Sequence, residues 1–382
     1  MSSEAIFDQL DQIVTQGDKA GALDTLIQHL ESAGQFHELF EALKMKLRFE
    51  LGLPTAQALA EPVLDQETES RLESGLISAC RQVGEAFWKA GQVREGWMYM
   101  RPVGDRPLAA SLLNRLPVTD ENYEDLINVL LHEAVDVRRG YQIALQRLGT
   151  CNSITMFDQS LATRPRADQQ AAAELLVRHV HRELLGNLKR DIERREGKLP
   201  DEHTAEGILE NRPDLLKDGV YHLDTSHLAS TVRFARVVDD REVLSLAFDI
   251  AMYGKKLHPQ YQYPGDEPFL DQYPAAIAFF RALLGQQVDV GIRYFTQKAD
   301  SVDQQQFGLL AVEILIDLLA RCGRIPEAIA ETERRIPPGA RTMGIAPPLL
   351  QLSQRLGDYT EMQRICRARQ DLLGYTAALM RG

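Results

Sequence analysis

Glycine joints between amphipathic stretches recur along this chain and limit the folds that it can adopt. At each joint, a glycine followed by a polar residue separates two stretches whose apolar side chains recur every three or four positions. Glycine at the end of a helix adopts the left-handed backbone conformation without steric cost, and the polar residue after it starts the next helix. Each joint therefore predicts a helical hairpin. Five such joints centre on Gly17, Gly34, Gly91, Gly323 and Gly357.

Helical periodicity dominates the rest of the chain as well, so we expect an all-α fold. No segment has the alternating Val, Ile, Thr and aromatic residues that are typical of a strand. Hydrophobic residues form 44% of the 382-residue sequence, which supplies a packed core and excludes a disordered or fibrous chain. We expect N-terminal hairpins at 1–115, a central helical region at 116–275 and C-terminal repeats at 276–382.

The C-terminal joints resemble those of tetratricopeptide (TPR) repeats over residues 306–375. Gly323 and Gly357 lie 34 residues apart, which is the period of this repeat. The segment 357–361, Gly-Asp-Tyr-Thr-Glu, resembles the turn sequence of the family, and Ala328 falls where the family has a small residue in its second helix. The resemblance implies a TPR-like α-solenoid of antiparallel helical hairpins, whose concave face binds a peptide or protein partner.

The charge balance and the lack of a long apolar segment narrow the choice of partners. A net charge of −12 argues against nucleic acid, because phosphate binding requires clustered Lys and Arg. The most apolar segment, 309–320, contains Glu313 and Asp317 and is shorter than the roughly 20 residues of a membrane span. The N-terminus has no basic and apolar leader, and the four cysteines are far apart. We therefore expect a cytoplasmic protein with free thiols and no membrane partner.

A segment rich in proline and tyrosine, from Pro259 to Pro274, predicts a long central loop. Its four prolines exclude a regular helix at this density. Loops of this length are uncommon in compact domains and are often functional. Pro264 and Gly265 suit the two central positions of a tight turn, which would present the Asp266 carboxylate to the central histidines. The alternative is a strap whose aromatic side chains seal the core, with its acidic residues in solvent.

Histidines gather in the middle of the chain, where they offer candidate metal ligands. Seven of the nine lie between His132 and His258, several of them close to a carboxylate. Neutral imidazole and carboxylate bind divalent metals such as zinc, manganese or iron. The candidate metal ligands are His132, Glu133, His179, Glu183, His222 and His227. The structural alternatives are hydrogen-bonded core histidines and, for His179 and Glu183, a helix pair that is partly exposed.

The segment 221–227, Tyr-His-Leu-Asp-Thr-Ser-His, also suits acid–base chemistry without a metal. Histidine titrates near neutral pH, so a histidine beside a carboxylate can transfer protons. The candidate catalytic residues are His222, Asp224, His227 and Asp266. Alternatively, Asp224 or a neighbouring hydroxyl caps a helix, with His222 just before that helix and His227 in its first turn.

Two classes of function follow from these patterns. The sequence lacks the phosphate-binding loop, the dinucleotide-binding glycine motif, the nucleophile elbow and the zinc-protease motif. Together with the repeat period, this favours a TPR-like scaffold that binds a peptide or protein. The alternative is a metal-dependent or His/carboxylate acid–base enzyme, of hydrolase or lyase type, that binds a small molecule in a central pocket. It requires His132, His179, His222 and His227 to lie together.

Overall fold

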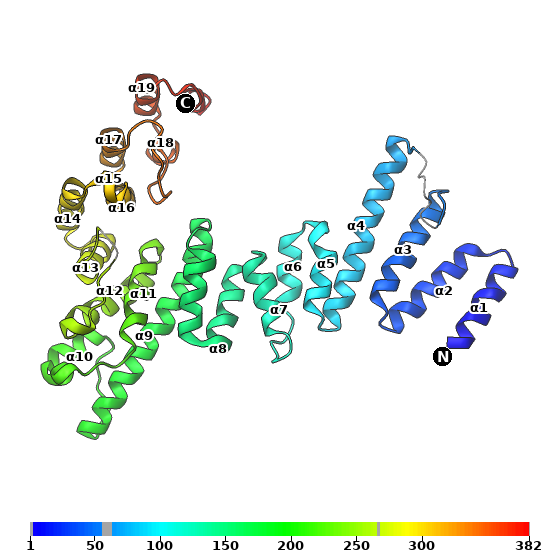
Figure 1. Ribbon diagram of the computed structural model, residues 1–382, viewed down its shortest axis with the longest axis horizontal. Coiled ribbons are helices and arrows are strands. Elements are labelled where there is room, and N and C mark those ends of the chain that lie inside the picture. Colours follow the sequence, from blue (N-terminus) through cyan, green and yellow to red (C-terminus); the bar gives the residue numbers. More distant parts are fainter. Residues whose placement is uncertain (1–2, 56–62, 266–267, 382) are drawn as a thin grey trace. The chain divides into compact units, whose positions relative to one another are not determined.

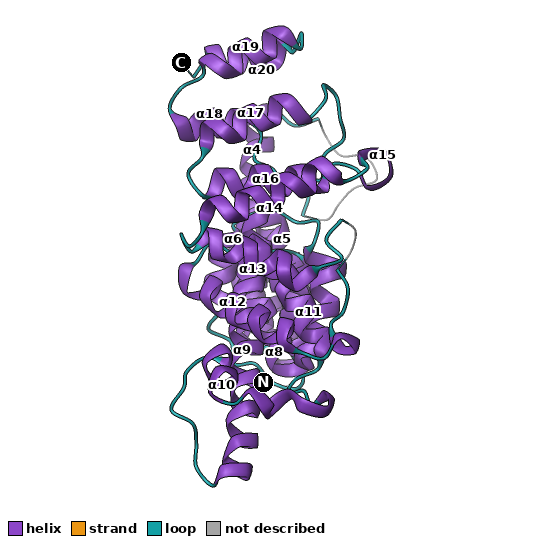
Figure 2. Cartoon of the chain, turned by 90° about the vertical axis from the view of Figure 1, so that its left-hand side faces the viewer, coloured by secondary structure: helices purple, strands orange, loops and turns teal. Residues whose placement is uncertain are grey.

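All regular secondary structure in the described part of the chain is helical (Figure 2). The computed structural model describes residues 3–55, 63–265 and 268–381. Within these ranges it confirms the all-α expectation, and none of their helices is long and apolar enough to cross a membrane. The four cysteines are free thiols, as expected from their spacing. Backbone contacts divide the chain into two compact units, Met1–Gly149 and Thr150–Gly382.

The first unit is a series of helices in which each of the first four packs against the next (Figure 1). Its helices are α1 (Ser3–Thr15), α2 (Lys19–Ser32), α3 (Phe36–Glu50), α4 (Gln66–Lys89), α5 (Val93–Val103), α6 (Arg106–Leu113), α7 (Tyr123–Ile127) and the π-helical turn η1 (Asn128–His132). The side chains of Ile27, Leu39 and Phe87 belong to one buried cluster that joins α2, α3 and α4. α8 (Val137–Met156) is interrupted at Gly149, where φ is 78° and ψ is 176°, and the unit ends there.

The second unit continues the same pattern and contains the helices that build the candidate site. Its helices are η2 (Phe157–Leu161), α9 (Arg166–Glu196), α10 (Ala205–Asn211), η3 (Pro213–Gly219), α11 (Thr225–Phe234), η4 (Ala235–Val237), α12 (Arg241–Lys256), η5 (Pro259–Tyr261), α13 (Gln272–Leu283), α14 (Val288–Ser301), α15 (Gln304–Phe307), α16 (Leu310–Arg321), α17 (Ile325–Arg335), α18 (Leu349–Leu356), α19 (Thr360–Ala368) and α20 (Leu372–Leu379). From α12 onward most of the longer helices pack against the next one, as α16 does against α17 (Figure 1).

The glycine joints adopt the conformation that the sequence predicts. The φ angles are +85° at Gly17, +70° at Gly34, +80° at Gly91, +77° at Gly323 and +74° at Gly357. All five lie in the left-handed region, where an L side chain is strained. The joints therefore end one helix and begin the next.

Replacing Gly357 with valine should destabilise the C-terminal helices by about 1–2 kcal/mol. No heavy atom lies within 4 Å of a Cβ built on Gly357, so the cost comes from the left-handed backbone and not from a clash. Gly186 in α9 is a matched control, because its Cβ position is equally open and its φ is not positive. Urea unfolding monitored by circular dichroism should show a loss for Gly357→Val and none for Gly186→Val. Equal curves for the two variants would contradict the hairpin geometry.

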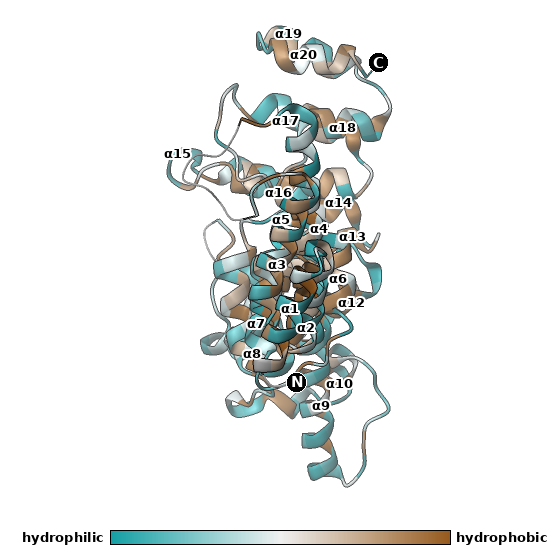
Figure 3. Cartoon of the chain, turned by 90° about the vertical axis from the view of Figure 1, so that its right-hand side faces the viewer, coloured by the Kyte–Doolittle hydropathy of each residue, from teal (hydrophilic) through white to brown (hydrophobic). Residues whose placement is uncertain are grey.

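α16 is the most deeply buried helix of the second unit. Figure 3 shows that most helices carry both polar and apolar stretches, as expected when one face is buried. In α16, all ten residues from 311 to 320 are buried, Glu313 and Asp317 included. A buried carboxylate is costly unless other groups hydrogen-bond to it or pair with it. The two acids of this helix therefore indicate where polar partners converge.

The predicted loop from Pro259 to Pro274 is partly wrong, because α13 begins at Gln272 and includes Pro274. Proline is tolerated there because the first four N–H groups of a helix have no partner within the helix. Phe269 and Tyr273 are only 1% exposed, whereas Tyr263 is 51% exposed. One end of the segment therefore packs into the core, as a strap would.

Candidate functional site

The candidate metal ligands belong to different units of the chain. His132 ends the π-helical turn of the first unit, and the Glu133 carboxylate lies 3.8 Å from the Arg101 guanidinium. His179, Glu183, His222 and His227 belong to the second unit. In the part of the chain that the structure describes, no three His, Cys, Asp or Glu side chains are grouped so that they could hold a metal ion. The metal site therefore gains no support from the geometry.

His179 and Glu183 face the same side of α9, as their spacing predicts. The His179 Nε2 atom lies 3.5 Å from a Glu183 carboxylate oxygen. The Thr150 hydroxyl lies 3.0 Å from His179 Nε2 and donates a hydrogen bond of 3.2 Å to Glu183. Thr150, His179 and Glu183 therefore form a partly exposed polar cluster on the surface of α9.

His222 is held by two polar partners inside the second unit. Its side chain is 4% exposed, and its Nε2 atom lies 3.1 Å from an Asp191 carboxylate oxygen. The Tyr253 hydroxyl accepts the backbone N–H of His222 at 2.9 Å and lies 3.1 Å from Nδ1. We assign the neutral tautomer in which Nδ1 accepts the Tyr253 proton and Nε2–H donates to Asp191. His222 therefore fastens the segment before α11 to α9 and α12.

The pKa values of both members of this pair are lowered, for different reasons. Burial lowers the pKa of His222 below its ordinary value of 6.5, and the Asp191 carboxylate only partly opposes this effect. Burial raises the pKa of Asp191, but hydrogen bonds from His222 and Arg195 outweigh it and hold that pKa below its ordinary value. The pair at neutral pH is therefore a neutral imidazole and an ionised carboxylate.

The second unit should lose stability as the pH falls below 6.5, the ordinary pKa of a histidine, because folded His222 has a lower pKa than unfolded His222. As the pH falls, the unfolded chain binds the extra proton first, so the free energy of unfolding declines until the folded pKa is passed. Urea unfolding at about pH 7, 6 and 5 measures this decline. The decline should be smaller in His222→Gln, and an identical pH dependence in both proteins would contradict the assignment.

Asp224 caps α11, as one of the two sequence interpretations states. Its carboxylate accepts the backbone N–H of Ser226 at 2.9 Å and the Ser226 hydroxyl at 2.6 Å. These hydrogen bonds hold the pKa of Asp224 below its ordinary value. His227 is the third residue of α11, within its first turn, and Asp266 lies outside the described residues.

A cavity of about 660 Å³ is present in the second unit. It lies between the start of α9, the end of α11, α16 and two loops that contain Phe269 and Gly344. The wall combines aromatic rings with charged side chains. Its described lining includes Phe157, Phe234, Phe269, Phe279, Ile314, Arg164, Arg166, Arg233, Arg236, Asp158 and Asp317.

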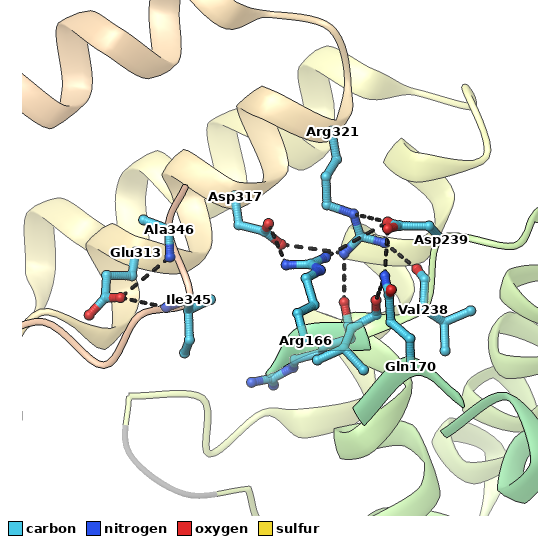
Figure 4. A network of polar contacts seen from close by, with 11 residues as sticks. Arg166, Gln170, Val238, Asp239, Glu313, Asp317, Arg321, Ile345 and Ala346 are labelled. Carbon is cyan, nitrogen blue, oxygen red and sulfur yellow. Dashed lines mark hydrogen bonds and ion pairs between the residues drawn. The ribbon is translucent and has the colours of Figure 1, made fainter. Parts of the chain in front are cut away.

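A network of ion pairs fixes one wall of the cavity (Figure 4). Asp317 is bound by Arg166 at 2.9 Å and by Arg321 at 3.3 Å. Arg321 also lies 2.9 Å from Asp239, and its guanidinium donates to the backbone carbonyls of Arg236 and Val238. Burial lowers the pKa of Arg321, and the two aspartates oppose that effect. The network therefore ties α16 to α9 and η4 and holds the lining residues in place.

The loop at 343–346 is fixed by the second buried acid of α16. The Glu313 carboxylate, which is 0% exposed, accepts the backbone N–H groups of Met343 at 2.7 Å and Ile345 at 2.8 Å. It also accepts the N–H of Ala346 at 3.3 Å (Figure 4). Charge-assisted bonds of this kind are roughly twice as strong as neutral ones, so the loop that lines the cavity has a defined backbone.

No known protein-family model matches the chain, and no curated protein matches it. A solved structure to which the chain is similar is described as a "Circular tandem repeat protein with novel repeat topology and enhanced subunit contact surfaces". The match covers 99% of this chain and 86% of that chain at 13% identity, with a TM-score of 0.16.

Proposed function

We propose that this chain is a TPR-like helical scaffold and that a peptide or protein segment binds in the cavity of its second unit. The volume of about 660 Å³ falls within the roughly 300–1,000 Å³ of ligand pockets. We propose the bounds 116–275 for the central region and 276–382 for the C-terminal repeats. Residues of both regions line the cavity.

The observation that carries this proposal is an apolar cavity whose walls are held in place before any ligand arrives. Phe157 and Phe234 stack with ring centroids 4.1 Å apart. The Arg166–Asp317 pair and the Glu313 contacts fix the neighbouring walls. A wall that is already ordered costs a ligand less conformational entropy on binding, so a short segment can bind with useful affinity.

The alternative of an acid–base enzyme would rest on His222, Asp224, His227 and Asp266, and a metal enzyme would add His132, Glu133, His179 and Glu183. The pairing of His222 with Asp191 is the observation that favours acid–base chemistry. The His222 side chain is only 4% exposed, however, and both ring nitrogens already have partners. Elemental analysis of the purified chain tests for a metal, and a bound stoichiometric zinc would support the alternative.

The scaffold proposal is tested by selecting peptides from a random twelve-residue phage library on the immobilised full-length chain. We expect enriched peptides whose synthetic, fluorescein-labelled forms bind the chain in solution. Binding should be lost in Ala162→Trp, because Ala162 is exposed and lines the cavity, so the indole would fill its mouth. Exposed residues tolerate such changes, so the fold should persist.

Ala330→Trp provides the matched control, since Ala330 is an exposed residue of α17 outside the cavity lining. It should bind the selected peptides as the unmodified chain does. A library that yields no enriched peptide would overturn the proposal. Equal binding to the unmodified chain and to Ala162→Trp would also overturn it, because the peptides would then bind elsewhere.

A further inference from the structure

We propose that a second copy of this chain covers the outer face of α20, with the two α20 helices packed antiparallel about a two-fold axis at Thr376. The proposal depends neither on the cavity nor on a peptide partner. It follows from the pattern of apolar side chains on α20, from their exposure and from the charges at the two ends of the helix.

Helix α20 contains no charged residue and is apolar on both its inner and its outer side. Its inner side packs against α19 and α18 (Figure 2). There, Ala378 belongs to a buried cluster with Met362 and Cys366, and Tyr375 packs against this cluster. A helix that is apolar all round is typical of a buried position, because exposed apolar surface is unfavourable in water. The outer side of α20 is exposed, and we therefore infer that it is an interface.

The exposed apolar side chains form one continuous face centred on Thr376. Residues that are three or four positions apart lie on the same side of a helix. The residues three and four positions before Thr376, and three and four positions after it, are all large and apolar, with exposed fractions between 49% and 86%. They are Leu372, Leu373, Leu379 and Met380. A contiguous exposed face of this kind marks an interaction site.

This face is complementary to itself when a second α20 runs in the opposite direction. If Thr376 lies opposite the Thr376 of the second copy, Leu372 lies opposite Met380. Leu373 then lies opposite Leu379, so that each large apolar side chain meets another. The Thr376 hydroxyl already donates to the Leu372 carbonyl at 2.8 Å, so it brings no unsatisfied donor into the contact. A surface that pairs with itself about a two-fold axis produces a closed dimer.

The charges at the two ends of α20 favour the antiparallel direction. Asp371 caps the start of the helix, where its carboxylate accepts the backbone N–H of Gly374 at 2.9 Å. Arg381 follows the end of the helix, and both residues lie five positions from Thr376. Both are exposed, and within the described part of the chain neither forms an ion pair. In the antiparallel pair each Arg381 lies beside the Asp371 of the other copy, whereas a parallel pair would bring like charges together.

A lipid surface is the other partner that an exposed apolar helix can have. Helices that lie on a membrane carry Lys and Arg along their polar side. Helix α20 has neither residue, and its other side is buried against α19. A second copy therefore fits this face better than a membrane does.

Sedimentation velocity of the unmodified chain tests for the dimer. Because the contact involves only two short helices, we expect a dissociation constant of about 10 μM, measurable at roughly 1–100 μM chain. Leu373→Asp and Met380→Asp should each raise this constant at least about tenfold, because each places a charge in the desolvated face. Both side chains are exposed in the single chain, so the fold should persist, and circular dichroism melting checks this.

Val290→Asp is the matched control for Leu373→Asp. Like Leu373, Val290 is an exposed apolar residue in the first turn of a helix, in this case α14. The dissociation constant of this variant should equal that of the unmodified chain.

Disulfide cross-linking tests the two-fold symmetry. The background is Cys151→Ser, which removes the exposed native thiol. Thr376→Cys should link to itself on oxidation, because the two copies of this residue face one another on the axis and a disulfide needs its Cα atoms within about 7 Å. Leu373→Cys should link to Leu379→Cys in an equimolar mixture and should not link to itself.

Four results would overturn the inference. The first is a chain that stays monomeric at 100 μM, and the second is a dimer that persists in both aspartate variants, because it would then form through another surface. The third is a dimer in which Thr376→Cys does not cross-link. The fourth is a monomeric chain that sediments with phosphatidylcholine–phosphatidylserine vesicles and loses this binding in Leu373→Asp, which would assign the face to a lipid surface. None of these results bears on the scaffold proposal, whose peptides bind elsewhere in the second unit.

Discussion

Replacing Asp249 with asparagine is expected to lower the free energy of unfolding of the second unit by about 2–4 kcal/mol, because each buried donor that loses its acceptor costs about 1–3 kcal/mol. Asp249 is 4% exposed, and its carboxylate accepts the backbone N–H groups of Ala205 at 2.7 Å and Glu206 at 2.8 Å. It also lies 2.8 Å from Nε2 of the buried His181. An asparagine of the same shape would turn an NH₂ group towards these donors.

The loss of stability should begin at α10, because the first N–H groups of this helix are bound by the Asp249 carboxylate. The Thr204 hydroxyl accepts the next one, from Gly207, at 3.1 Å. Hydrogen exchange of residues 205–211 should accelerate, and the urea midpoint of the second unit should fall. Asp240→Asn is the matched control, because Asp240 caps α12 at a half-exposed site where asparagine caps equally well. Similar stability losses for the two variants would contradict the role assigned to Asp249.

The elements that the sequence predicted correctly depend on local backbone chemistry. A glycine between two amphipathic stretches predicts a helix end from the local sequence alone. The positions of the joints at Gly323 and Gly357 could therefore be predicted without knowledge of tertiary contacts. The Asp224 cap is equally local, since its carboxylate binds an amide two residues away. The prediction that Pro274 lies in a loop is wrong, because proline is excluded from a helix interior but is accommodated in the first turn.

The cavity could not be predicted in the same way, because its walls are joined by residues that are distant in sequence. Arg166 and Asp317 are 151 residues apart, and Arg321 and Arg236 are 85 apart. One signal was available: Glu313 and Asp317 interrupt the most apolar segment, and a buried acid requires a partner. That signal identifies the acids but not their partners, because no spacing in the sequence indicates which arginine or amide reaches them.

Replacing Glu313 with glutamine is expected to cost about 2–4 kcal/mol and to weaken peptide binding as well. Three backbone N–H groups of the loop at 343–346 converge on this carboxylate. A neutral amide offers one acceptor oxygen and places an NH₂ group against the other donors. Each donor that is left without an acceptor in the interior costs about 1–3 kcal/mol, so the loop should detach from α16.

The loop carries Met343, Gly344 and Ile345, which line the cavity, so its release should lower peptide affinity even where the helices stay folded. Glu327→Gln is the control, because Glu327 is an exposed residue of α17 whose ion pair with Arg324 is solvated and contributes little to stability.

Urea unfolding gives the stability change, and fluorescence anisotropy with the selected peptide gives the affinity. Limited proteolysis should cut Glu313→Gln within residues 337–348 and leave Glu327→Gln intact there. Unchanged affinity together with rapid cleavage of this loop would show that the cavity does not need the loop, and the peptide would then have to bind the α9 and α11 walls alone.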